Sequence, residues 1–189
     1  ESKRKKVFVG LYVNDFVFFS EDPAEEAKFC EQLQTKLRVD FMGDVDYFLG
    51  TAFTWLRHDD ENKNVSVHLS QSAFVEYAAH RFGVSSMKRV PNMTPYHSGL
   101  PIDSIPGAPP EDFEDPTFLP RREMYQSIVG SLNWLATNTR PDLAPITSFL
   151  AAYNNNPSQG HIDAALYAIK YLRQTVDYGI AFHSKAPSA

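Results

Sequence analysis

Few side chains in this sequence have a type and spacing that suit catalysis or metal binding. Asn14 and Asp15 separate two hydrophobic runs, residues 7–13 and 16–19, so we expect them at the tip of a tight β-hairpin. There they would present an amide and a carboxylate, whose oxygen atoms are the ligands that hard cations prefer. Asn-Asp is also a common pair in hairpin turns, and the residues by themselves favour that structural role.

The other candidate side chains argue against further kinds of site. Cys30 is the only cysteine, which excludes an internal disulfide and a multi-cysteine metal site, and we expect it to be a small core residue. No serine can be combined with a histidine and an acid on the basis of spacing. The six histidines lack the spacing of zinc ligands; they are His58, His68, His80, His97, His161 and His183.

Length and composition indicate a globular protein. The 189 residues, 43% of them hydrophobic and 13% aromatic, suffice for one large or two small domains with a core, and they exclude a wholly disordered chain. No apolar run approaches the roughly 18–20 residues of a membrane-spanning helix, and the first residues do not form a secretory signal. We therefore expect a soluble intracellular protein, either cytoplasmic or nuclear, with no membrane partner.

The charges are unevenly distributed. The chain carries 18 basic and 23 acidic residues, a net charge of −5, and residues 21–61 hold eleven of the acids against four cations. Strong binding to nucleic-acid phosphates by the chain alone is therefore disfavoured. Lys3, Arg4, Lys5 and Lys6 form a basic cluster suited to nuclear import or phosphate binding, but a solvated lead-in to the first strand is the preferred interpretation.

The first part of the chain predicts strands and two helices. Asp22 and Pro23 suit the cap and first position of a helix that ends near Arg38, with Phe29, Leu33 and Leu37 on its apolar side. Residues 47–56 and 65–69 predict a second strand pair, joined by a polar loop over residues 58–64. A second helix runs from Ser70 to a stop at Gly83, and its apolar face comprises Phe74, Tyr77, Ala78 and Phe82.

A proline-rich connector separates this part from a helical one. Residues 90–120 hold eight of the thirteen prolines, and three helices with apolar stripes follow, the second starting after residues 139–142 and the third capped by Ser158. A last strand is expected over residues 178–182. The sequence thus predicts an α+β protein in three segments, residues 1–89, 90–120 and 121–189.

Tyr12-Val13-Asn14-Asp15 resembles the Tyr-Val-Asp-Asp active-site hairpin of reverse transcriptases. Further motifs follow in the order seen in copia-type (Pseudoviridae-like) LTR-retrotransposon polymerases, so that the resemblance spans residues 7–183. They are Asp44-Val-Asp-Tyr-Phe-Leu-Gly50, Leu69-Ser-Gln71, Arg81-Phe-Gly83, Asn92-Met-Thr-Pro95, Tyr125-Gln-Ser-Ile-Val-Gly-Ser-Leu-Asn-Trp-Leu-Ala136, Thr139-Arg-Pro-Asp142, His161, Tyr171-Leu-Arg173 and Asp177-Tyr-Gly179.

The resemblance implies a fragment of a larger enzyme. Residues 1–89 would be a partial palm of antiparallel hairpins and helices with a primer-grip-like strand pair and the start of the thumb, and residues 121–189 a helical thumb and connection region. Fingers and the first palm segment are expected before Glu1, and a ribonuclease H domain after Ala189. These segments and an RNA/DNA template–primer are the partners implied.

The family joins nucleotides by phosphoryl transfer that uses two Mg²⁺ ions. An aspartate of the missing palm segment and the first aspartate of the hairpin hold these ions. Asn14 stands at that second position, which leaves Asp15 in a degenerate metal-binding turn. At an effective dielectric of about 20, loss of a unit charge about 4 Å from a dication costs several kcal/mol. We expect this chain alone to bind no Mg²⁺ and to be inactive as a nucleotidyltransferase.

Further residues are implied in nucleic-acid contact, namely Tyr12, Phe53, Trp55, Gln71 and Arg81. The alternation of Phe53 and Trp55 fits an ordinary strand face equally well, and residues 140–142 are expected to form a structural salt-bridged corner between helices. The first functional hypothesis is therefore an inactive fragment of an RNA-directed DNA polymerase. The alternative is a domesticated, non-catalytic interaction module.

A partial palm sheet has a structural consequence in either case. Without its remaining strands it exposes an edge and an apolar face, which favour association with other strands. We expect a homo-oligomer formed through that edge, or a rearranged sheet that covers it.

Overall fold

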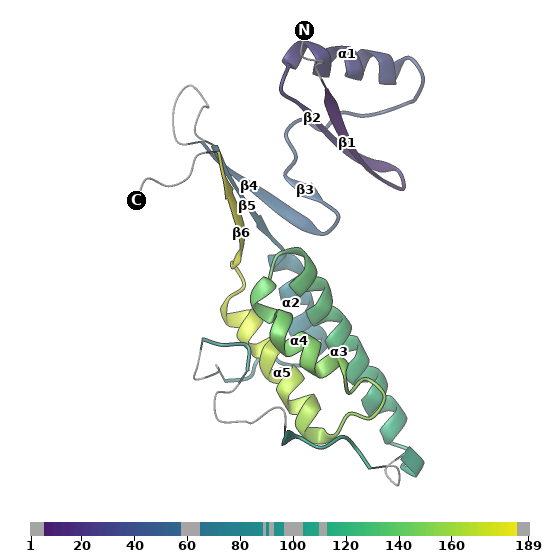
Figure 1. Cartoon of the computed structure of the whole chain (residues 1–189), viewed down its shortest axis with the longest axis vertical. Helices are drawn as coiled ribbons and strands as arrows, with labels where there is room; N and C mark the ends of the chain where they lie inside the picture. The colour runs from purple at the N-terminus through teal and green to yellow at the C-terminus, as the bar shows by residue number, and fades with distance from the viewer. Residues whose placement is uncertain are drawn as a thin grey trace. The chain divides into compact units, whose positions relative to one another are not determined.

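The computed structural model of the chain divides into two compact units, Glu1–Phe48 and Leu49–Ala189, and each is described by itself (Figure 1). The expected polar loop over residues 58–64, His97 and most of the basic cluster at the start lie outside the described residues. The structure describes residues 6–57, 65–88, 90, 93–96, 104–109 and 113–184.

The described residues form antiparallel sheets and five α-helices, which confirms the predicted α+β class. The assignment of the chain's segments to palm, thumb and connection stays a prediction. None of the described helices is long and apolar enough to cross a membrane.

The first unit contains a hairpin and one helix. Strands β1 (Val7–Tyr12) and β2 (Asp15–Ser20) pair antiparallel, and α1 (Pro23–Gln34) follows, with the two-residue strand β3 (Tyr47–Phe48) at the end of the unit. Asp22 caps α1 as predicted, since its Oδ1 accepts a hydrogen bond from the N–H of Ala24 at 2.9 Å.

The predicted position of the hairpin turn is wrong by one residue. Val13 and Asn14 form the turn, and Asp15 is the first residue of β2, where it pairs with Tyr12. This register places Phe8 opposite Phe19, and their rings stack with centroids 4.9 Å apart. Cross-strand aromatic pairing of this kind fixes the register more strongly than the turn preference of aspartate does.

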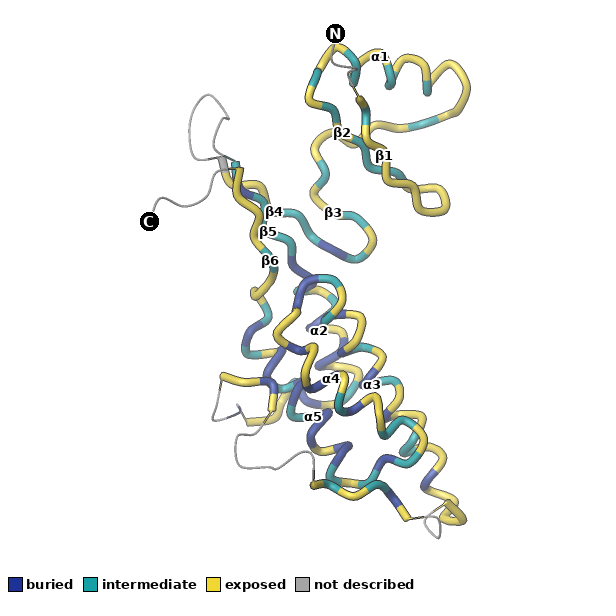
Figure 2. The backbone as a smooth tube through the Cα atoms, viewed as in Figure 1, coloured by how far each residue is buried: buried dark blue, intermediate teal, exposed yellow. Residues whose placement is uncertain are grey.

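The first unit has no core of its own. None of its described residues is buried, as Figure 2 shows by the absence of dark blue along the hairpin and α1. Phe29 of α1 and Phe41 pack against Phe18 on one face of the hairpin, with ring centroids 5.2 and 5.9 Å from that of Phe18. The opposite face, which carries Phe8 and Phe19, stays exposed. A unit built in this way gains little free energy from burial.

The second unit begins with an antiparallel sheet of order β4-β5-β6. Its strands are β4 (Thr51–Arg57), β5 (Val65–Ser70) and β6 (Gly179–His183). The predicted single strand over residues 47–56 is interrupted because Leu49 and Gly50 both have left-handed backbone angles, with φ of 49° and 80°. The expected last strand is present one residue later than predicted, and it pairs with β5 across more than 100 residues of sequence.

Helices α2 (Ser72–Arg81), α3 (Phe118–Asn138), α4 (Ala144–Ala151) and α5 (Gln159–Gln174), with the 3₁₀ turn η3 (Pro141–Leu143), enclose the hydrophobic core (Figures 1 and 2). Gly83 ends the α2 region with φ +70°, as predicted. Tyr77 was expected on the apolar face of α2 but is 54% exposed, and Val75 and Ala79 are buried there instead.

A buried guanidinium ties the corner between α3 and α4 to the end of α5. Arg140 is 2% exposed, and its Nε and Nη2 donate to the two carboxylate oxygens of Asp142 at 3.0 and 2.8 Å. Its Nη1 donates to the carbonyl of Thr175 at 2.9 Å, and the hydroxyl of Tyr171 donates to Asp142 at 2.7 Å. The predicted salt-bridged corner is therefore confirmed, and it extends to a third segment, the end of α5.

The same contacts set the protonation of Asp142. Burial alone raises the pKa of its carboxyl, but hydrogen bonds from Arg140 and Tyr171 lower it more, so the pKa lies below the ordinary value of 3.8. The native state then holds this proton more weakly than the unfolded chain does. The stabilisation is present above a pH of about 4 and is lost as the pH falls further.

Arg140→Leu should lower the free energy of unfolding of the second unit by about 3–5 kcal/mol, because it leaves a half-buried carboxylate without its cation and removes a charged donor from the Thr175 carbonyl. Urea denaturation followed by circular dichroism measures this loss. Arg121→Leu is the matched control, since it removes an exposed pair with Asp115 and should cost far less. Equal losses in the two variants would contradict a special role for the buried corner.

Candidate nucleic-acid interface

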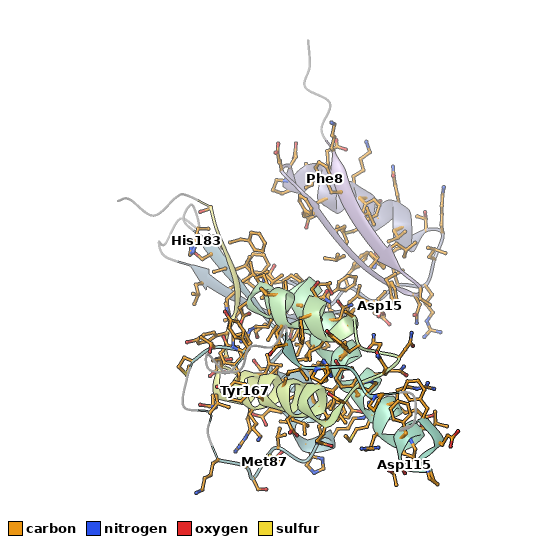
Figure 3. The ribbon with its side chains drawn as sticks, turned by 60° about the horizontal axis from the view of Figure 1, so that its bottom comes forward. Phe8, Asp15, Met87, Asp115, Tyr167 and His183 are labelled. Carbon is orange, nitrogen blue, oxygen red and sulfur yellow. The ribbon has the colours of Figure 1, made fainter. Side chains whose placement is uncertain are left out.

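The hairpin tip displays the side chains that the sequence singled out. Val13, at the first turn position, has φ 55° and is 82% exposed, and Tyr12, Asn14 and Asp15 are exposed beside it. Asp15 is labelled in Figure 3. Tyr12 and Asp15 are directly opposed in the register and therefore share one face of the hairpin. A β-branched residue with positive φ is a strained conformation, and such strain is found mainly at functional sites.

The tip does not fit a two-metal centre. Asp15, the first residue of β2, supplies a single carboxylate beside the turn, and Asn14 in the turn supplies an uncharged amide. Among the residues that the structure describes, no group of three or more histidine, cysteine or carboxylate side chains could hold a metal ion. Two Mg²⁺ ions bring four positive charges, and one carboxylate cannot offset them.

Phe53 and Trp55 lie together on one face of the β4-β5-β6 sheet. The register places Phe53, Leu69 and Ile180 in one row across the three strands and Trp55, Val67 and Phe182 in the next. None of these six side chains is fully buried and none is charged. This face offers apolar and aromatic contact, but these side chains offer no charge to pair with a phosphate.

Gln71 and Arg81 flank α2 and lie in different environments. Gln71, just before the helix, is buried, and its Oε1 accepts a hydrogen bond from the hydroxyl of Thr139 at 2.9 Å. Gln71 is therefore not at the surface, where a nucleic-acid contact would have to be. Arg81 is exposed at the end of the helix, where it donates to the hydroxyl of Tyr77 at 3.3 Å and lies 5.5 Å from the Phe82 ring centroid. Of these two, Arg81 is the one that a ligand can reach.

Sequence reasoning missed one exposed helix face. Gly130, in the middle of α3, shares a face with Asn133, Trp134 and Thr137 by helical spacing, and all four residues are exposed, Trp134 by 41%. A glycine inside a helix costs about 1 kcal/mol relative to alanine. A Cβ at Gly130 would meet no atom within 4 Å, so nothing within the described chain requires this glycine. The sequence signal was present, because Gly130 interrupts an otherwise regular helical pattern.

Cations gather at a separate place in the second unit. Arg173 of α5 reaches the turn after α2, where its Nη1 lies 3.5 Å from the carbonyl oxygen of Met87, the neighbour of Lys88 in the sequence. Figure 3 labels Met87. Arg173 and Lys88 are both exposed. They supply two exposed cations on a chain of net negative charge.

Comparison with known proteins identifies relatives among transposon proteins. The chain is similar to the Retrovirus-related Pol polyprotein from transposon TNT 1-94 of Nicotiana tabacum, with 25% identity over 98% of the chain and 13% of that protein. It is also similar to the Retrovirus-related Pol polyprotein from transposon RE2 of Arabidopsis thaliana, with 28% identity over 94% of the chain and 11% of that protein. The chain thus spans about an eighth of these relatives or less.

A shorter similarity involves another kind of protein. Over 58 residues, 31% of the chain, the sequence is 36% identical to the Secreted RxLR effector protein 161 of Plasmopara viticola, covering 41% of that protein. No family model and no solved structure matches the chain. The similarity to the two transposon Pol polyproteins over most of the chain confirms the expected relationship to retrotransposons at that level.

Val13→Gly should stabilise the hairpin by roughly 1 kcal/mol, because glycine adopts a positive φ without the steric penalty that valine incurs. Val9→Gly is the matched control: the same substitution inside β1 should destabilise the hairpin instead. Amide hydrogen exchange of β2 residues in the whole chain measures both effects. Destabilisation by both substitutions would show that Val13 is not strained.

Proposed function

We propose that this chain is the palm–thumb–connection part of a copia-type retrotransposon reverse transcriptase. The observation that carries the proposal is the similarity to transposon Pol polyproteins over 98% of the chain. The exposed Tyr12-Val13-Asn14-Asp15 hairpin supports it, since Asp15, the first strand residue after the tight turn, is placed where such an enzyme would bring a carboxylate to the metals. In the parent protein the first unit would belong to the palm and the helical unit to the thumb and connection.

In this proposal the exposed face of α3 lies against the template–primer duplex. Gly130 lets the backbone of α3 approach the duplex closely, and Trp134, one turn further, offers an aromatic surface. Asn133 and Thr137 add uncharged hydrogen-bonding groups on the same face. Contacts of this kind respond to the shape of the duplex and to its sugar–phosphate backbone, and they carry little sequence specificity. Arg81 would supply a phosphate contact.

The proposal also assigns partners to the hairpin unit. With none of its described residues buried, the unit needs other strands or segments to cover the face that carries Phe8 and Phe19. The palm and finger segments of the parent would supply them, and with them a second carboxylate for Mg²⁺. Alone, the chain would add no nucleotides. In the absence of the palm and finger segments, a second copy of the chain would pair with the exposed sheet edge in their place.

A second candidate function is a non-catalytic interaction module derived from a retroelement. Two observations favour it, the amide of Asn14 beside a single carboxylate and the 36% identity to a secreted effector over 58 residues. Such a module would retain the fold and lose affinity for nucleic acid. Duplex binding therefore separates the two candidates.

The chain should bind an RNA–DNA duplex at low salt, and its affinity should fall as the salt concentration rises because Arg81 contacts a phosphate. Gly130→Leu should weaken this binding at least tenfold, because its side chain occupies the space that the duplex would use. Gly130→Ala is the internal control: it should stabilise α3 by about 1 kcal/mol and leave binding within about threefold. Fluorescence anisotropy and urea denaturation provide the two readouts. Absence of measurable binding at low salt would favour the interaction module.

The chain should incorporate no nucleotide in primer extension with Mg²⁺ or Mn²⁺. Asn14→Asp should not restore activity, because the upstream palm carboxylate is still missing from the site. Any product should require the upstream palm segment, added in trans. Asp15→Asn is the control and should abolish product formation in the presence of that segment. Template-dependent incorporation by the chain alone would contradict the proposal of a silent fragment.

A further inference from the structure

The first turn of α5 is closed by a histidine. Ser158 precedes the helix as its cap, and His161 stands at the third helical position, where a glutamate or glutamine usually completes a capping box. The Nδ1 atom of His161 accepts a hydrogen bond from the backbone N–H of Ser158 at 3.2 Å and lies 2.9 Å from the Ser158 hydroxyl. A backbone N–H can only donate, so Nδ1 carries no proton and the neutral ring holds its proton on Nε2.

The ring of His161 is enclosed on all sides. The side chain is 0% exposed and stacks on Tyr153 with centroids 3.9 Å apart, with Phe149 of α4 at 5.9 Å. Its Nε2 is buried, and no hydrogen-bond acceptor reaches it among the described residues. Buried polar groups are ordinarily satisfied, and a buried cation needs a partner even more than a neutral ring does.

Among the described residues, the ionisable groups near the ring offer no such partner. Tyr153 on the connection before Ser158 and Tyr125 on α3 carry a phenol group and no carboxylate, and burial raises the pKa of the Tyr125 hydroxyl. The α4 helix carries no ionisable side chain, and residues 104–109 and 152–160 carry none besides Tyr153. Arg122 of α3 is a cation and therefore cannot serve as a counter-ion.

Carboxylates on α5 and α2 are turned to solvent. Asp163 of α5 is exposed and accepts a hydrogen bond from Gln159, and α2 carries Glu76, His80 and Arg81, all exposed. Burial therefore acts on His161 unopposed and lowers the pKa of its imidazole below 6.5. The N-terminal end of α5 adds to this, since a helix N-terminus disfavours positive charge.

A separate segment of chain is held at the same place. The N–H of Ala108 donates to the carbonyl of Asn156 at 2.8 Å, and Ala108 is buried. Ile105 packs so closely over Gly160 that a Cβ there would lie 3.0 Å from its Cγ2. Residues 104–109 are therefore held at Asn156, just before the Ser158–His161 cap, and at Gly160, within it.

We propose that His161 is a proton-operated clasp that fastens residues 104–109 to the junction of α4 and α5. A proton taken from solvent by Nδ1 turns this atom from an acceptor into a donor, which breaks the bond from the Ser158 N–H. It also places a cation in an apolar site that has no counter-ion within the described part of the chain. The junction then opens, and residues 104–109 are released from Asn156 and Gly160.

The direction of the pH dependence follows from the lowered pKa. The unfolded chain binds a proton at His161 below a pH of about 6.5, whereas the native clasp resists it. The clasp is fully closed above this pH and loosens as the pH falls below it. This range is distinct from that of Asp142, whose contribution is lost only below a pH of about 4. The clasp does not depend on the proposed polymerase ancestry.

Nuclear magnetic resonance of the whole chain between pH 7.5 and 5 tests the clasp. The Ala108 and Ser158 amide signals should move together with the titration of His161, and the open fraction should rise about tenfold per pH unit below 6.5 until the clasp is open. His161→Gln keeps a neutral acceptor at the cap position, so its amide signals should not change with pH. His80→Gln, which removes an exposed histidine, should behave as the native chain does.

Two results would overturn the proposal. One is an unchanged pH response in His161→Gln, which would place the titrating group elsewhere. The other needs no variant and holds even if His161→Gln does not fold: ring ¹⁵N shifts of the native protein at pH 7.5 that show the proton on Nδ1. The proton on Nε2 at that pH, with a joint response of His161 and Ala108 on acidification, would support the clasp.

Discussion

The buried guanidinium of Arg140 is the constraint on which the helical unit depends. A charge at 2% exposure is tolerated only because every side of it has an acceptor or an aromatic ring, and these come from Asp142, Thr175, Tyr171 and Tyr178. Satisfying this one group fixes the corner after α3 and the end of α5 together. The chain then leaves α5 at the point from which β6 reaches the edge of β5.

The sequence predicted most elements whose ends carry local signals. Asp22, Ser158 and Gly83 marked helix boundaries correctly, because capping and left-handed stops are decided by neighbouring residues. The turn at Val13-Asn14 and the break at Leu49-Gly50 were not predicted. Both place a residue other than glycine at positive φ, which local preference disfavours and which strand register and sheet geometry impose.

The candidate site was predicted only in part, for a similar reason. The hairpin with Asp15 could be read from a short motif, because the whole feature lies within a few residues. The burial of Gln71 could not be predicted, since its partner Thr139 is 68 residues away. Gly130 and His161 gain their meaning from what surrounds them, open space in one case and a closed aromatic pocket in the other. Residue type and spacing describe neither.

The pairing of β5 with β6 has a consequence for how the protein is made. Ser66 and His183 are partners although 117 residues separate them, and a Cβ at Gly179 would overlap the Leu69 carbonyl, so only glycine allows the strand to settle there. During translation β5 emerges early from the ribosome and must wait with an open edge until the codons for 179–183 have been read. Throughout this interval the open edge of β5 can pair with a wrong strand, and a chaperone that covers β5 would reduce such mispairing.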